Sequence, residues 1–195
     1  MADELKGKRV AVLATEGFEE SELLEPKRAL EGAGAHVDVV SPAQGRIRAW
    51  KHTDWGTDVP VDVAVAEARA DDYDALLLPG GVMNPDRLRT DQHAVALVGD
   101  MFRAGKPIAA ICHGPWTLVE AGVVRGLRVT SWPSLKTDLT NAGANWVDEQ
   151  VVVDRGLVTS RKPDDIPAFN ARMIEEFAEG HHERPDSRNL ASSRA

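Results

Sequence analysis

The sequence contains a single cysteine, Cys112, among its 195 residues. A lone cysteine cannot form an intramolecular disulfide, which excludes a small disulfide-stabilised scaffold. The chain also lacks any apolar run near the roughly 20 residues that span a bilayer. Its first ten residues, "MADELKGKRV", are charged and contain no apolar signal-peptide core. We therefore expect a cytoplasmic protein with no membrane partner.

Basic residues are outnumbered, with 23 Lys and Arg against 31 Asp and Glu, and they form no long run. The net charge of −8 predicts an acidic surface that repels phosphate backbones, so we expect no nucleic-acid partner. Apolar residues make up 43% of the chain, which is ordinary for a soluble globular protein. We expect one domain over residues 1–180 and a flexible polar tail over 181–195.

Short apolar runs alternate with helical patterns along most of the chain. The predicted strands are 9–15, 35–42, 73–81, 106–114 and 127–132, and the predicted helices are 20–34, 93–105, 115–122 and 163–180. The strands are apolar throughout, which is typical of strands buried on both faces of a parallel sheet. The alternation therefore predicts an α/β fold with a mostly parallel central sheet.

Three local details refine this prediction. A helix tolerates proline only near its start, because proline cannot donate a helical hydrogen bond. We therefore expect Pro26 to lie early in its helix. Asp164 or Asp165 is available to cap the last helix, and Pro167 falls near its first turn. Residues 41–68 lack a helical period and predict an extended ribbon, and 146–161 predict a hairpin that turns near 154–156.

Cys112 follows a predicted buried strand and precedes the pair Gly114-Pro115. Open α/β sheets bind ligands at the carboxyl ends of their strands, which is where this thiol lies. A tight strand-to-helix turn presents a nucleophile, and a helix N-terminus favours the thiolate. The alternative is a buried core cysteine, which is common.

A nucleophilic cysteine needs a base or a charge partner. His113 is the one histidine certain to lie near Cys112, although adjacent side chains tend to point apart. The segment "EGFEESELLEP" brings several acids, including Glu22, to the same sheet edge, where most would stabilise a helix start. Gly80 and Gly81 end another strand at this edge and could offer backbone N–H groups to an oxyanion.

Two other patterns do not predict sites. The segment "GAGAHV" resembles part of a dinucleotide fingerprint, but it follows a helix and opens a strand, which is the reverse of the required order. The triplet "HHE" at 181–183 is a weak metal pattern within the expected tail. We expect no cofactor and no metal.

Several segments together resemble the ThiJ/PfpI family of the class I glutamine amidotransferase-like superfamily, over about residues 8–178. They are "FEESE", "DALLLPGG", "GKPIAAICHGPWTL" and "NAGANWVDEQVVVDRGLVTSRKPDDIPAFN". The resemblance implies a flavodoxin-like three-layer sandwich that assembles as a dimer or hexamer. True glutamine amidotransferases carry a histidine after a late strand, but "VTSRKPDD" has none, which argues against glutamine hydrolysis.

The same resemblance implies roles for particular residues. Cys112 matches the nucleophile, His113 the histidine that follows it, and Glu22 the glutamate that hydrogen-bonds the thiol. Gly81 and the backbone of His113 match the oxyanion hole. Asp86 matches an acid that a neighbouring subunit supplies to the histidine, although the loop "VMNPD" is one residue longer here.

Three functions remain open on this basis. The first is a cysteine enzyme acting on small dicarbonyls or glycated adducts, a glyoxalase or deglycase. The second is an intracellular cysteine peptidase, which would use the same thiol on a peptide substrate. The third is a non-enzymatic redox sensor or chaperone, in which Cys112 oxidises to a sulfinate stabilised by Glu22.

Overall fold

The computed structural model describes residues 3–184, and its centre is a seven-stranded sheet. The strands run in the order β11 (Val151–Asp154), β12 (Leu157–Ser160), β8 (Ile108–Ile111), β7 (Ala75–Leu78), β1 (Arg9–Leu13), β3 (His36–Ser41) and β6 (Val63–Ala64). Neighbours are parallel except for the β11–β12 hairpin. From β3 to β12 the order is the 2-1-3-4-5 of flavodoxin-like folds, which confirms the expected class.

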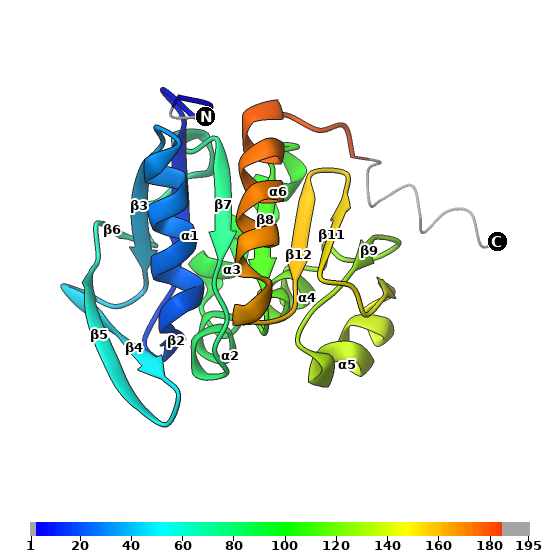
Figure 1. Ribbon diagram of the computed structural model, residues 1–195, viewed down its shortest axis with the longest axis horizontal. Helices are drawn as coiled ribbons and strands as arrows, with labels where there is room; N and C mark the ends of the chain where they lie inside the picture. Colours follow the sequence, from blue (N-terminus) through cyan, green and yellow to red (C-terminus); the bar gives the residue numbers. More distant parts are fainter. Residues whose placement is uncertain (1–2, 185–195) are drawn as a thin grey trace.

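Helices cover both faces of the sheet and make three layers (Figure 1). Helices α1 (Glu20–Gly32) and α6 (Ile166–Glu179) lie side by side on one face, and α3 (Gln92–Arg103), α4 (Pro115–Glu120) and α5 (Lys136–Asn141) pack on the other. Successive side chains of strand β1 point to opposite faces of the sheet and so pack into both hydrophobic cores. Val10 and Val12 face α1 and α6, while Ala11 and Leu13 face the opposite layer. Each fully buried Val or Leu contributes roughly 1.5–3 kcal/mol.

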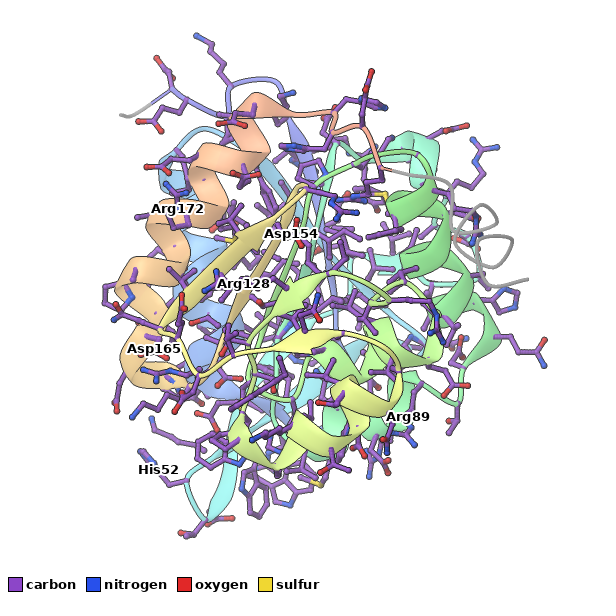
Figure 2. All side chains as sticks on the ribbon, turned by 90° about the vertical axis from the view of Figure 1, so that its right-hand side faces the viewer. His52, Arg89, Arg128, Asp154, Asp165 and Arg172 are labelled. Carbon is purple, nitrogen blue, oxygen red and sulfur yellow. The ribbon has the colours of Figure 1, made fainter. Side chains whose placement is uncertain are left out.

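Smaller elements surround this sandwich. The predicted ribbon is confirmed as β4 (Arg46–Lys51) and β5 (Asp54–Pro60), which pair antiparallel beside β2 (Phe18–Glu19). His52 lies at the tip of this ribbon (Figure 2). The remaining elements are α2 (Met83–Leu88), β9 (Arg128–Val129), β10 (Asn145–Trp146) and the 3₁₀ turns at Ala70–Asp72, Pro133–Leu135 and Pro163–Asp165.

Two predictions about elements are wrong. Pro26 lies in the middle of α1 and is buried there, so packing against the core outweighs the lost backbone hydrogen bond. The strand predicted over 127–132 shortens to β9, which pairs with β10 in a separate two-stranded ribbon. The hairpin predicted over 146–161 is confirmed, with its turn at 155–156 between β11 and β12.

The chain beyond α6 is held against the domain as far as the structure describes it. The backbone N–H of His182 donates to the carbonyl of Gly105 (2.8 Å). The Arg184 guanidinium donates to the carbonyls of Phe102, Lys106 and Arg155 at 2.8–3.0 Å. Residues 182 and 184 of the predicted tail thus make hydrogen bonds to the domain, and residues 185–195 lie outside the described residues. No helix within 3–184 is long and apolar enough to cross a membrane.

Arg161 links the end of β12 to the start of α6. Its guanidinium contacts both carboxylate oxygens of Asp165 (2.8 and 3.2 Å) and one oxygen of Asp148 (2.8 Å). Asp165 is 3% exposed and stands at the predicted N-cap position of α6, but its side chain does not cap the helix. The carboxylate is used for this ion pair instead, which fixes the start of α6 beside β12 (Figure 2).

Asp165→Asn should lower the free energy of unfolding by about 1–3 kcal/mol, because it leaves a buried, charge-assisted contact of Arg161 incomplete. Urea unfolding of the two proteins measures the loss. Asp164→Asn is the matched control, since the Asp164 side chain is 80% exposed and its pair with Lys162 is screened by water. Equal urea midpoints for wild type and Asp165→Asn would contradict this role.

Candidate active site

Cys112 occupies a strained turn directly after β8. Its φ angle is +62°, in the left-handed region that non-glycine residues rarely adopt. The turn is fixed by backbone hydrogen bonds, because the Cys112 N–H donates to the carbonyl of Ser160 (3.0 Å) and its own carbonyl accepts from Trp132 (2.9 Å). The structure thus has the predicted strand-to-helix turn, with the thiol 7% exposed at its tip.

The turn lies where the direction of the sheet reverses. The chain moves from β1 to β3 on one side and then from β7 to β8 on the other, so the carboxyl ends of β1, β7 and β8 meet. Ligands of doubly wound folds bind at such a switch point. The loops after these strands bring together Glu22, Gly81 and Cys112, which are separated by up to 90 residues in the chain.

Glu22 lies in the first turn of α1 and is fully buried. One carboxyl oxygen, Oε2, accepts the N–H of Gly80 (3.0 Å), and Oε1 is buried without a hydrogen bond from any described residue. Burial, followed by the charge of Glu19, raises the pKa of Glu22 to about 8, against the opposing effect of its contact with Cys112. Glu22 therefore carries a proton at neutral pH.

The environment of Cys112 differs from the sequence prediction. Burial and the charge of Glu22 raise the pKa of the thiol, while the backbone N–H groups of Gly81 and His113 lower it. The predicted stabilisation of the thiolate by the helix start is therefore not the dominant effect, because the site is almost closed to water. Glu22 and Cys112 cannot both ionise at such close range, and because the pKa of each group is raised, each keeps its proton at neutral pH.

His113 lies beside the thiol despite being its neighbour in sequence. Its Nδ1 is 3.2 Å from Cys112 Sγ, because the positive φ of Cys112 turns both side chains to the same side. Burial lowers the pKa of His113 to about 4, so the imidazole is neutral. Trp116 and Trp132 flank the ring, with centroids 5.3 and 6.0 Å away.

The two glycines after β7 have different functions. Gly81 has a φ of +80°, and its backbone N–H lowers the pKa of both Cys112 and Glu22. The N–H of Gly80 is used by Glu22, so the prediction that Gly80 donates to a substrate is wrong. A Cβ at Gly80 would lie 2.6 Å from the Cβ of Cys112, and this close approach is what requires glycine there.

Sequence reasoning missed two residues that shape the site. Asn84 is fully buried, accepts the N–H of Thr15 (2.8 Å) and donates to the carbonyls of Pro79 (3.0 Å) and Gly80 (3.1 Å). It thereby joins the loops after β1 and β7. Ser134 places its hydroxyl 3.4 Å from His113 Nε2, at the end of a turn that no motif marks.

Asp86 is not brought to the thiol within one chain. It is exposed on α2, and it does not line the pocket around Cys112. Within residues 3–184 no carboxylate forms an ion pair or hydrogen bond with His113; its ring contacts Cys112 and Ser134 instead. The acid that the family resemblance implies for this histidine is therefore absent from the single chain's site.

The pocket above the thiol is small and mostly apolar, with a volume of about 220 Å³. Its lining residues are Glu19, Glu22, Trp50, Gly81, Val82, Cys112, His113, Trp132 and Pro163. Pockets for drug-sized ligands span roughly 300–1,000 Å³, so this one suits a small molecule or a single side chain. A larger groove of about 720 Å³ lies along α3, but neither cysteine nor histidine lines it.

Comparison with known proteins agrees with this geometry. The sequence profile of the DJ-1/PfpI family matches residues 8–176. A deglycase from Pyrococcus abyssi is 45% identical over 166 residues, covering 85% of this chain and 97% of the relative. General stress protein 18 from Bacillus subtilis is 43% identical over 170 residues, covering 86% and 96%.

The solved structures show the same likeness. DJ-1beta from Drosophila melanogaster superimposes with a TM-score of 0.80 at 31% identity, covering 88% of this chain and 90% of that one. The chain therefore belongs to the DJ-1/PfpI family, and the resemblance found from its motifs is confirmed.

Glu22→Gln should simplify the titration of Cys112. Wild type should show two steps in the pH dependence of iodoacetamide labelling, because two coupled groups lose their protons in turn. The glutamine amide resembles the protonated acid but does not ionise, so only one step should remain. Glu25→Gln, which alters an exposed acid of the same helix, should retain both steps; superimposable curves for wild type and Glu22→Gln would rule out the coupling.

Proposed function

We propose that this member of the DJ-1/PfpI family is a cysteine-dependent glyoxalase or deglycase, which removes small dicarbonyls and their adducts during stress. The observation that carries the proposal is the buried triplet at one turn: the Cys112 thiol, the protonated Glu22 and the neutral His113, whose Nδ1 lies 3.2 Å from the sulfur. A nucleophile, a proton donor and a proton acceptor are what addition to an aldehyde requires.

With methylglyoxal, the Cys112 sulfur would attack the aldehyde carbon. A C–S bond forms while the thiol proton moves to Nδ1 of His113, and the C=O electron pair moves to oxygen, which takes a proton from Glu22 to give a hemithioacetal. Transfer of the proton from His113 to Glu22 would then restore both groups. The backbone N–H groups of Gly81 and His113 lower the pKa of Cys112 and would stabilise the oxyanion. Glu22 would supply the proton, because burial keeps it protonated at neutral pH.

The neutral imidazole would perform the next step. His113 would take the proton from the former aldehyde carbon and return it to the neighbouring ketone carbon, which leaves a thioester of lactate. Water then hydrolyses the thioester, releasing lactate and the thiol. One carbon is oxidised and its neighbour reduced, so methylglyoxal and water give lactate without a cofactor, and neither oxidant nor reductant is needed.

Two further facts support this choice. The pocket of about 220 Å³ accommodates a substrate of dicarbonyl size, and a deglycase and a general stress protein are among the relatives. A lone thiol remains reduced in a reducing compartment, so we place the activity in the cytoplasm. Peptidase activity would use the same thiol and N–H donors, and is distinguished by assay.

Cys112→Ser should reduce lactate release from methylglyoxal at least tenfold, a loss of about 1.4 kcal/mol or more in transition-state stabilisation. Serine is nearly isosteric, so circular dichroism should be unchanged. A fluorogenic peptide assayed in parallel should be cleaved slowly or not at all. Efficient peptide cleavage without lactate release would favour the peptidase, and activity in neither assay with a sulfinate at Cys112 would favour a redox sensor.

We also propose that a second subunit completes the site through Asp86. His113 lacks a carboxylate partner within the chain, and Asp86 is exposed on α2, which begins two residues after Gly81. An acid brought against the imidazole would fix its tautomer and orientation. The small substrate would then be enclosed by the dimer or hexamer that the family resemblance implies.

Asp86→Ala should lower the catalytic rate about tenfold or more without unfolding the protein. Mixing it with inactive Cys112→Ser protomers, after verified subunit exchange, should restore part of the activity, because some interfaces then pair an intact Cys112 with an intact Asp86. Glu120→Ala, which removes an exposed carboxylate at the end of α4, is the matched control. A protein that sediments as an active monomer would contradict the arrangement.

A further inference from the structure

A second cluster of ionisable side chains lies far from Cys112, at the opposite end of α6. Glu176 and Glu179 occupy the last turn of this helix, one turn apart. Gly180 ends the helix with a φ of +83° and turns the chain, so His182 faces back toward the same two acids. One ligand atom from each of the three residues lies within 4.8 Å of the others.

The position of His182 is set by two glycine turns. A Cβ at Gly156, in the turn between β11 and β12, would lie 2.6 Å from Cγ of the His182 ring. The His182 N–H is held by the carbonyl of Gly105, and Arg184 fixes the following residues through three backbone carbonyls. Figure 1 shows the chain leaving α6 beside this hairpin turn. The imidazole is therefore held in place by the fold.

Two groups of this cluster, the Glu176 carboxylate and the His182 Nε2 atom, are buried but poorly satisfied. His182 Nε2 is buried and forms no hydrogen bond with any of residues 3–184, although Glu176 Oε2 lies 3.3 Å away. The Glu176 side chain is nine-tenths buried, and burial raises its pKa. Arg172, which is labelled in Figure 2, is the cation one turn earlier on α6. It pairs with Glu175 at 2.5 Å.

The spacing of the two buried atoms matches that of metal ligands. Two ligands at about 2.0–2.1 Å from a tetrahedral zinc ion lie roughly 3.3–3.4 Å apart. The distance of 3.3 Å between His182 Nε2 and Glu176 Oε2 falls at this value, and the pair is not oriented as a hydrogen bond. Glu179, which is exposed, can rotate its carboxylate to a third position.

We propose that Glu176, Glu179 and His182 form a binding site for a divalent transition-metal ion of the zinc type. One imidazole nitrogen and two carboxylates suit zinc and its neighbours, whereas Mg²⁺ and Ca²⁺ prefer oxygen ligands alone. The sequence predicts no metal here, because "HHE" is a weak pattern within a tail expected to be flexible; the proposed ligands are instead spaced Glu-x-x-Glu-x-x-His across the helix end. A bound ion would connect the end of α6 to the segment that follows it.

Isothermal titration with ZnCl₂ tests the proposal, using full-length protein whose thiol has been blocked with iodoacetamide so that Cys112 cannot bind zinc. One zinc ion should bind, and His182→Gln should weaken its binding about tenfold or more. His181→Gln is the matched control and should bind as the parent does. Co²⁺ should give the visible absorption of a low-coordinate site in the parent, and His182→Gln should lose it.

Glu179→Gln provides a second variant, because an exposed residue at a helix end can change without unfolding the protein. It should also weaken zinc binding, by less than His182→Gln. The proposal is overturned if the parent gives no heat with ZnCl₂ up to millimolar concentration. Equal affinities in His181→Gln, His182→Gln and Glu179→Gln would equally overturn it, since the zinc would then be bound elsewhere.

Discussion

The close packing of two ionisable groups, Glu22 and Cys112, at one buried turn is the constraint on which the site depends. Both groups are buried at the same switch point, and two negative charges there would be far more costly than one. Backbone N–H groups partly offset this cost: Gly80 donates to the Glu22 carboxyl group, Gly81 lowers the pKa of both groups, and His113 lowers that of Cys112. The backbone after β7 and β8 therefore supplies N–H donors to both groups.

Much of this arrangement could be predicted from the sequence. Apolar runs ending in Pro-Gly-Gly and Cys-His-Gly place both turns at the carboxyl edge of a parallel sheet, and the motifs identify the family. These signals are local, because a strand and the turn that ends it are adjacent in the chain. The pairing of Glu22 with Cys112 comes from the family resemblance, and the motifs alone do not give the strand order that the structure has.

The parts that could not be predicted depend on three-dimensional burial. The sequence predicts that a helix start lowers the pKa of the thiol. In the structure, burial and the charge of Glu22 raise that pKa instead. Adjacent side chains were expected to diverge, but the φ of Cys112 brings His113 onto the sulfur. Pro26 survives inside α1 because its ring is buried, and the chain after α6 is held by contacts more than 25 residues away in sequence.

The backbone conformation of Cys112 has a consequence for how the sequence can change. A non-glycine residue in the left-handed region costs about 1–3 kcal/mol, a sizeable part of the 5–15 kcal/mol that stabilises an ordinary domain. Glycine would adopt the same φ without that penalty. Selection for stability alone would therefore favour glycine at position 112. The cysteine is kept for its reactive thiol, although it lowers the free energy of unfolding.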